Sequence, residues 1–303
     1  MSADRHRLDL TALAMGLAFS IMWSSAFATA RVIVAYAPPL WALTIRFAIS
    51  GLIAVIVARA LGQSWRLTRP IALSVLVFGL CQNALYLGFN FVALQWVEAS
   101  IASIIASSMP LIVATLGWVL GREKVPPLGQ LGLALGTAGV ALVMGTRVTG
   151  GADPMGIALC VIGATALAVA TLTVRSVSAG GNLLMVVGLQ MWVGSAALAV
   201  AALVTEPWHV TPSLPLLFAF LYQIFIPGLT ATILWFALVK RVGATRASTF
   251  HFMNPFFGVT LSALLLGETI SKTDIVGVLI AMAGILAVQM SRFRPPAPTD
   301  PQP

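Results

Sequence analysis

Residues 91–143 read FVALQWVEASIASIIASSMPLIVATLGWVLGREKVPPLGQLGLALGTAGVALV, and residues 236–288 read FALVKRVGATRASTFHFMNPFFGVTLSALLLGETISKTDIVGVLIAMAGILAV. Placed 145 residues apart, the two stretches are identical at 14 of 53 positions. The shared positions include Pro110 with Pro255 and Glu123 with Glu268. A biased composition alone gives about one match in ten, so the excess at Pro, Glu and Gly indicates a duplicated unit.

The composition is that of a chain embedded in lipid. It is 59% hydrophobic and only 9% charged, whereas a soluble domain carries about a quarter charged residues. The net charge of +8 is spread between apolar runs and forms no basic stripe, so we expect no nucleic-acid partner. Cys81 and Cys160 both lie inside apolar runs, which favours neither a disulfide nor a metal site.

Ten apolar stretches are long enough to cross a bilayer as helices, which takes about 20 residues each. They run over 11–34, 40–61, 71–94, 99–120, 128–144, 155–174, 183–204, 214–239, 244–266 and 275–291. Breaks rich in Pro and Gly separate them. The sequence therefore predicts an all-α integral membrane protein with ten transmembrane helices and no cofactor or metal.

The duplication divides the chain into two repeats of five helices each, over 1–148 and 149–292. The remaining residues, 293–303, are rich in proline, and we expect this tail to be disordered. Because five is an odd number, the second repeat enters the membrane from the side opposite to the first. Two inverted repeats are typical of secondary transporters, whose halves rock between two related states.

The basic residues fall mostly on one side of this ten-helix arrangement. With the N-terminus inside, 13 of the 17 Lys and Arg residues lie at cytoplasmic ends. Two lie in outside loops, Arg147 and Lys272, and two lie within spans, Arg31 and Arg46. Such asymmetry is what the positive-inside rule describes. It predicts a multi-pass protein of the cell inner membrane with both termini in the cytoplasm.

Three motifs carry a resemblance to a known family. The first span contains IMWSSAF at 21–27, and the second contains Arg46. A pattern of Ala-Ser, a mid-helix proline and a glutamate occurs in both halves: Ala102-Ser103, Pro110 and Glu123, then Ala247-Ser248, Pro255 and Glu268. With these motifs the chain resembles the EamA-domain form of the drug/metabolite transporter superfamily, from Leu13 to about Met290. The second half has no counterparts of Trp23 and Arg46. Leu167 and Gln190 lie near the corresponding positions.

The resemblance implies ten helices, cytoplasmic termini and a central cavity lined by helices 1, 3, 4, 6, 8 and 9. Among the branches of the superfamily, the chain looks most like the amino-acid and metabolite exporters, including the YddG-type exporter of aromatic amino acids. The resemblance alone implies export rather than import.

Polar residues inside the spans are the candidates for substrate binding, because such residues usually face the interior of a bundle. Asn83, Tyr86 and Asn90 share one helix face, and three polar side chains in one stripe exceed what packing needs. Trp23 and Trp235 are candidates for stacking on a substrate. The predicted substrate-binding residues are Trp23, Asn83, Tyr86, Asn90, Ser107, Trp235, His251 and Asn254; no residue is predicted to be catalytic.

Several of these residues have an alternative role. Serines in membrane helices often bond to a carbonyl of their own helix, which would make Ser107 a packing residue. His251 is the one histidine within a predicted span, and it can either carry a proton or serve as a neutral hydrogen-bonding group. Pro110 and Pro255 interrupt their helices, and we predict them to be hinges, with a fixed kink as the alternative.

Charged residues at the span ends are expected to be structural. We expect Arg46 to extend toward the outer interface or to pair with Glu98, rather than to bind a substrate carboxylate. Glu123 and Glu268 precede the next helix in each repeat, so we expect them to cap helix N-termini.

The predicted function is a secondary transporter that exports small metabolites, most of all amino acids, by alternating access through a central cavity. The alternatives are a passive facilitator or channel, or a carrier of nucleotide sugars or drugs from the same superfamily. An enzyme is not expected, because the chain has no HExxH, GxSxG or P-loop motif. The expected partners are a small-molecule substrate and the lipid bilayer; we expect a monomer and leave an oligomer open.

Overall fold

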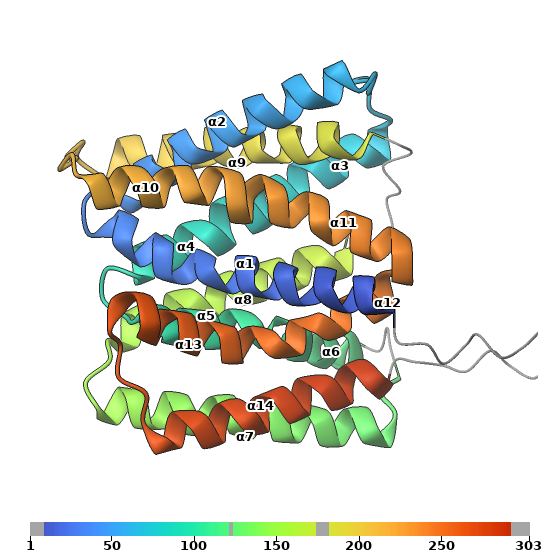
Figure 1. Ribbon diagram of the computed structural model, residues 1–303, viewed down its shortest axis with the longest axis vertical. Helices are drawn as coiled ribbons and strands as arrows, with labels where there is room; N and C mark the ends of the chain where they lie inside the picture. Colours follow the sequence, from blue (N-terminus) through green and yellow to red (C-terminus); the bar gives the residue numbers. More distant parts are fainter. Residues whose placement is uncertain (1–8, 121–123, 174–181, 292–303) are drawn as a thin grey trace, which may run out of the picture.

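The computed structural model describes residues 9–120, 124–173 and 182–291. Within these ranges every element is helical, and ten helices are long and apolar enough to cross a membrane. They lie side by side along a common direction (Figure 1). The predicted all-α, ten-helix fold class is therefore confirmed. The tail 293–303 and Glu123 lie outside the described residues.

Six of the spans are single helices and four are built from several segments. The single helices are α1 (Leu10–Val34), α2 (Pro39–Ala60), α7 (Pro127–Thr149), α8 (Pro154–Thr173), α9 (Leu183–Thr205) and α14 (Lys272–Ser291). The segmented spans are α3 (Arg69–Phe78), η1 (Gly79–Tyr86) and α4 (Leu87–Ala93); α5 (Ala99–Ser107) and α6 (Met109–Val119); α10 (Leu214–Gln223), η2 (Ile224–Thr230) and α11 (Ala231–Val242); and α12 (Ala244–Thr249), η3 (Phe250–Met253) and α13 (Asn254–Leu266).

Proline and glycine set many of the helix ends. Pro39, Pro127 and Pro154 each stand at the first helical position, where a missing N–H costs nothing. Gly267 follows α13 in the left-handed conformation, with φ of 70°, and such a residue ends a helix at little cost because it lacks a side chain. The turn residues of the sequence thus place the loops between spans.

The four segmented spans are interrupted at equivalent points of the two repeats. The π-helical segments η1 and η2 begin at Gly79 and Ile224, which are 145 residues apart. The fourth span breaks at Ser108, and the ninth passes through the 3₁₀ turn η3. Each break directly precedes the helix turn containing Pro110 or Pro255, where proline removes a backbone donor. Irregular turns of this kind often mark functional sites in helical membrane proteins.

At one edge of the bundle, α7 and α14 pack against each other in antiparallel fashion (Figure 1). A Cβ atom added to Gly132 would lie 2.8 Å from the carbonyl oxygen of Gly284. One added to Gly139 would lie 2.6 Å from the carbonyl oxygen of Gly277. Glycine is needed because it lets two backbones approach closely. In the duplication Gly132 corresponds to Gly277 and Gly139 to Gly284. Each glycine of α7 therefore faces the counterpart of the other glycine and not its own counterpart.

At the opposite edge, α2 and α9 form the matching pair (Figure 1). Each helix begins beside the loop that follows the other, and each loop caps the other helix. The Glu206 carboxylate accepts a hydrogen bond of 2.9 Å from the Leu40 N–H, and the Gln63 amide oxygen accepts one of 3.0 Å from the Met185 N–H. These bonds satisfy backbone donors that a helix start leaves free.

The largest cluster of buried apolar side chains joins the first four spans with α8 and α9, around Phe27, Leu43, Phe91 and Ile105. Large apolar side chains are also exposed on the outside of the bundle, among them Leu264. An apolar exterior around a packed interior is the arrangement that a lipid environment requires.

Candidate functional site

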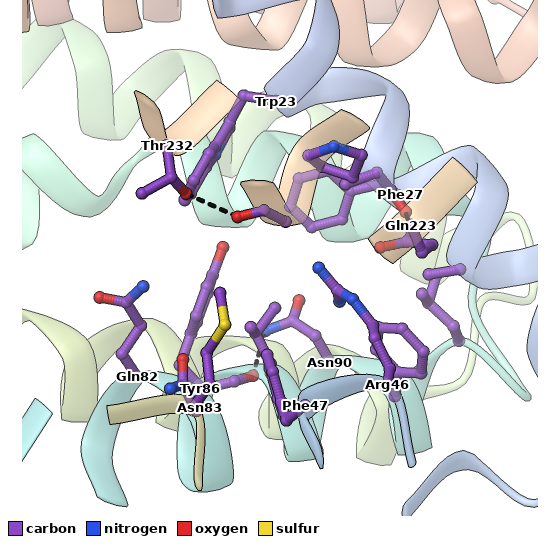
Figure 2. A pocket seen from close by; sticks show the side chains of 18 residues that line it. Trp23, Phe27, Arg46, Phe47, Gln82, Asn83, Tyr86, Asn90, Gln223 and Thr232 are labelled. Atoms are coloured by element: carbon purple, nitrogen blue, oxygen red, sulfur yellow. Dashed lines mark hydrogen bonds between the residues drawn. The ribbon is translucent and has the colours of Figure 1, made fainter. Parts of the chain in front are cut away.

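A cavity lies between spans 1, 2, 3, 7 and 8, and it offers a volume of about 70 Å³ to the centres of water-sized molecules. Figure 2 shows its side chains converging from two sides on a common space. The aromatic lining residues are Trp23, Phe27, Phe47, Tyr86 and Phe91, and the polar ones are Arg46, Gln82, Asn83, Asn90, Gln223 and Thr232. Apolar walls with a few polar groups are the usual make-up of a small-molecule site.

Four of the predicted binding residues line this cavity: Trp23, Asn83, Tyr86 and Asn90. Trp23 comes from α1, and the other three come from the third span, where η1 passes into α4. Asn83 donates a hydrogen bond of 2.9 Å to the carbonyl oxygen of Gln190 on α9. The polar stripe of the third span thus faces both the cavity and the second repeat.

Ser107, Trp235, His251 and Asn254 are not among the residues that line this cavity. Ser107 donates a hydrogen bond of 2.7 Å to the carbonyl oxygen of Ser103, four residues earlier. This is the bond within the helix that was the alternative to substrate binding.

Trp235 and His251 instead form an aromatic cluster with Phe19 beside the cavity. The ring centroids of Phe19 lie 4.8 Å from Trp235 and 5.4 Å from His251. Phe19 also lies 5.7 Å from Trp23, which stands one helical turn further along α1. The cluster therefore follows directly on the cavity wall, toward the beginning of α1.

Asn254 orients the His251 ring. Its side-chain nitrogen lies 3.0 Å from Nδ1 of His251. An amide nitrogen only donates, so this contact suits an imidazole whose Nδ1 accepts a hydrogen bond. This geometry suits the neutral hydrogen-bonding role that was the alternative to proton transfer.

Arg46 differs most from expectation. The expected pairing with Glu98 is wrong, because Glu98 binds Arg147 at 2.5 Å. Arg46 is only 6% exposed and lies in the cavity wall, with its guanidinium carbon 5.2 Å from the centre of the Phe47 ring. Among the described residues it has no hydrogen bond or ion pair, and its Nε is buried without a partner. One sequence signal pointed here: no Asp or Glu lies in mid-span to neutralise this arginine.

Two amide oxygens in the wall also lack a partner. Asn90 donates a hydrogen bond of 2.7 Å to the carbonyl of Tyr86, and Gln223 donates one of 2.6 Å to the carbonyl of Ala26. Because a carbonyl oxygen can only accept a hydrogen bond, each amide must turn its nitrogen toward that carbonyl. The amide oxygens, Oδ1 of Asn90 and Oε1 of Gln223, then have no partner among the described residues. Gln223 is not among the predicted binding residues, although it is a polar residue inside the predicted span 214–239; its equivalent in the first repeat is Phe78.

The lining helices also differ from those that the family resemblance implies. Spans 2 and 7 contribute to the cavity, and no described residue of spans 4, 6 or 9 lines it. Spans 4 and 9 pack directly together, since a Cβ atom added to Gly258 would overlap Ser103 Oγ at 1.7 Å. Gly163 on the sixth span likewise packs against the backbone of Tyr86. At these two positions the spans are packed without a gap between them.

At the end of the bundle where α7 stops, a group of charged residues joins the two repeats; we call it the clasp. Arg147 binds Asp274 at 2.8 Å as well as Glu98. Glu268 accepts hydrogen bonds from the N–H groups of Ala99 and Ser100. Glu268 therefore caps a helix, as expected, but the helix is α5 of the other repeat rather than the one that follows it.

The pKa of Glu98 in the clasp is raised. Burial is the main cause, and repulsion from Glu268 and Asp274 adds to it, while the Arg147 guanidinium acts in the opposite direction. Arg147 pairs with two carboxylates, those of Glu98 and Asp274, and Glu268 adds further negative charge near Glu98. The Glu98 carboxyl therefore holds a proton more readily than a carboxyl group in water does.

Comparison with known proteins matches both halves of the chain to one family. The model of the EamA-like transporter family matches residues 10–145 and 154–290. The chain is 28% identical to the uncharacterized transporter YvbV of Bacillus subtilis, with 93% of each chain covered. It is 25% identical to the uncharacterized inner membrane transporter YedA of Escherichia coli K12, covering 92% of this chain and 91% of that one.

Two more distant matches add to this. The chain is 23% identical to a probable amino-acid metabolite efflux pump of Salmonella typhimurium, covering 89% of this chain and 92% of the other. A crystal structure that is 21% identical superposes with a TM-score of 0.67, covering 93% of this chain and 97% of that one, which shows a shared fold. Because the family model matches both halves of the chain, this chain belongs to the EamA-like transporter family.

Proposed function

We propose that this membrane transporter exports amino acids through the cavity by alternating access. The observation that carries the proposal is the cavity itself, which joins aromatic walls to neutral polar groups and a single arginine. A zwitterion fits such a site because each of its two charges needs short polar contacts, which the neutral groups and the arginine can supply. The Salmonella relative named as a probable amino-acid metabolite efflux pump supports the same class of substrate.

The arrangement of the repeats supports alternating access. The antiparallel pairs α7–α14 and α2–α9 are what two inverted repeats would form, and such repeats supply two states of similar energy. We place the clasp on the outer side and both termini in the cytoplasm, following the distribution of basic residues. In the described conformation the clasp would then hold the outer end together, and the aromatic cluster of Phe19, Trp235 and His251 would separate the cavity from the inner end.

The interrupted spans are the places where each repeat can bend. The breaks before Pro110 and Pro255 lie at equivalent positions, and a helix with a missing hydrogen bond bends at lower cost than an intact one. We propose that these prolines act as hinges when the outer end opens.

Export is tested in cells and transport in vesicles. Cells that produce the protein should tolerate toxic amino-acid analogues better than cells without it, and greater sensitivity would indicate import.

In proteoliposomes the purified protein should transport amino acids and not nucleotide sugars. Trp23→Ala should reduce this transport, whereas Trp118→Ala, at a tryptophan that is 47% exposed outside the cavity, should leave it unchanged. Equal transport by both variants would remove the cavity from the mechanism.

A further inference from the structure

We infer that Arg46 binds the substrate carboxylate, and that Oδ1 of Asn90 and Oε1 of Gln223 receive the α-ammonium group of the same molecule. This inference rests on the proposed function and deepens it, because it names the part of the substrate that each residue recognises. Figure 2 shows Arg46 and Asn90 projecting from one side of the cavity and Gln223 from the opposite side.

The first argument is the missing counter-ion of Arg46. A charged side chain inside a membrane bundle is costly and is normally paired. Arg46 is buried, and the cavity lining of the described residues contains no Asp or Glu. A buried guanidinium that no protein group neutralises calls for an anion supplied by the ligand. Carboxylate suits this role because its two oxygens match the two parallel N–H donors of arginine.

The surroundings of Arg46 keep the guanidinium available. The Phe47 ring lies on one side of it, at 5.2 Å. Gly228 also lies beside the guanidinium, since a Cβ atom there would stand 3.8 Å from Nη2 of Arg46. A larger side chain at position 228 would occupy the space next to the donors. The guanidinium thus packs on the Phe47 ring, and the small Gly228 leaves its N–H donors accessible to a ligand.

The two repeats contribute unequally to the cavity. Met191 lies 145 residues after Arg46 and lines the same cavity. The equivalent of Asn83 is Gly228, which also lines it. The polar end of a substrate is therefore recognised mainly by the first repeat, although the fold itself is duplicated.

The second argument is the fixed orientation of the two amides. Asn90 and Gln223 are 2% and 0% exposed, and both use their nitrogen atoms on backbone carbonyls. Gln223 has a second bond, of 2.8 Å, to Thr29 Oγ1. Turning either amide over would set oxygen against oxygen, so each presents an acceptor that has no donor in the protein. An ammonium group carries three donors and no acceptor, which complements two such oxygens.

The inference makes a specific statement about substrates. Because of Arg46, a molecule without a carboxylate should bind poorly, and an amine should bind worst because its charge has the same sign. A carboxylate without the amino group should still bind, at reduced affinity. Substrates would thus be α-amino acids, with the side chain directed to the aromatic walls.

The test is a binding competition on the purified protein with labelled L-phenylalanine. The unlabelled competitors are L-phenylalanine, 3-phenylpropionate and 2-phenylethylamine, which carry both groups, only the carboxylate and only the amine. In the wild-type protein we expect this order of affinity, with about a tenfold loss for the acid, the size of a charge-assisted hydrogen bond, and no competition by the amine. An amine that competes as well as phenylalanine would overturn the inference without any variant.

Variants of Arg46 supply the second arm. Arg46→Met, which copies Met191, should lower the affinity for phenylalanine and for 3-phenylpropionate by about 100-fold, and Arg46→Lys by about tenfold, because lysine keeps the charge but loses the paired donors. Arg59→Met is the matched control, since Arg59 is an exposed arginine of the same helix, and it should bind like the wild-type protein. Unchanged affinities in Arg46→Met would contradict the inference.

The two proposals can fail separately. If the wild-type protein exchanges phenylalanine and Arg46→Met does so equally well, the proposed function stands and the role of Arg46 is wrong. If the wild-type protein, measured by calorimetry with each molecule alone, binds 3-phenylpropionate but not phenylalanine, and Arg46→Met loses that binding, the carboxylate site stands and amino-acid export is wrong. If none of the three molecules binds to the wild-type protein, both are wrong.

Discussion

The carboxylate of Glu268 accepts a hydrogen bond of 2.7 Å from the backbone N–H of Ala99. Glu268 belongs to the second repeat and Ala99 begins α5 of the first, so a helix of one repeat is capped by an acid of the other. A carboxylate at a helix N-terminus is favourable because it satisfies free donors and opposes the helix dipole. Arg147 adds a second link, to Asp274. Separating the repeats at this end requires both links to break.

Removing the cation of the clasp should open this end of the protein. In Arg147→Gln the Asp274 carboxylate, which is 1% exposed, would be buried without its arginine, and this favours a conformation in which it meets water. A cysteine placed at Ala30, in the cavity wall, reports the opening in a background lacking Cys81 and Cys160. A membrane-impermeant maleimide added outside should label it roughly tenfold faster in the variant.

Lys272→Gln provides the control for that measurement. Lys272 is an exposed cation next to the clasp that makes no contact in it, and its loss should leave the labelling rate unchanged. Equal labelling rates in Arg147→Gln and in the parent protein would show that the clasp does not hold the outer end closed.

Acid should strengthen the clasp through Glu98. Burial raises the pKa of this carboxyl above its ordinary value of 4.5, so the closed clasp binds a proton more tightly than an open one. The stabilisation is complete below the ordinary pKa and is lost as the pH rises through the raised value. The charged groups that face Glu98 are Arg147, Glu268 and Asp274, together with Arg31, which lines the hollow beside it.

The maleimide assay therefore should show slower labelling at pH 5 than at pH 8, after correction for the reactivity of the reagent. Glu98→Gln is neutral at every pH and should flatten this dependence. A dependence of the same size in Glu98→Gln would assign it to another group.

The glycine contacts between α7 and α14 should be intolerant of added volume. A Cβ atom at Gly284 would lie 2.2 Å from the backbone nitrogen of Gly136, and no side-chain rotation can relieve a clash with backbone. Gly284→Ala should therefore lower the free energy of unfolding by about 1–3 kcal/mol. Gly145→Ala on α7, where nothing lies within 4 Å of the added atom, is the control and should leave it nearly unchanged. Thermal unfolding in detergent compares the two.

The proposed hinges make a kinetic prediction. Pro110→Ala and Pro255→Ala restore a backbone donor at the break in each span, which should make bending costlier. Each should slow exchange more than it weakens substrate binding. Pro127→Ala, at the first turn of α7 where proline interrupts nothing, should change neither. Exchange at the wild-type rate in both hinge variants would leave the kinks as fixed structure.

The sequence predicted the parts of this molecule that depend on local pattern. Apolar runs located the ten spans, and helical spacing put Asn83, Tyr86 and Asn90 on one face that lines the cavity. Both follow from the period of the helix and from the cost of exposing polar groups to lipid. The duplication at 145 residues also anticipated where irregular turns recur, although only the prolines marked them.

Residues whose role depends on the meeting of distant spans were harder to predict. Arg46 lies in the second span and Glu98 directly precedes the fourth, but Glu98 forms its ion pair with Arg147 from α7. No spacing along the chain reveals this pairing. Gln223 gained its importance from Ala26, 197 residues away. Trp235 and His251 stand one helical turn beyond the cavity, since the rotation of a helix about its axis is set by packing.

Counterflow in proteoliposomes tests the alternating-access account most directly. Vesicles are loaded with unlabelled L-phenylalanine and diluted into labelled L-phenylalanine at low concentration. A carrier that must reorient around its substrate should accumulate the label transiently inside, above its equilibrium level, and Arg46→Met should not. If the label only approaches equilibrium, at a rate independent of the phenylalanine inside, the protein is a passive pathway and the central claim is wrong.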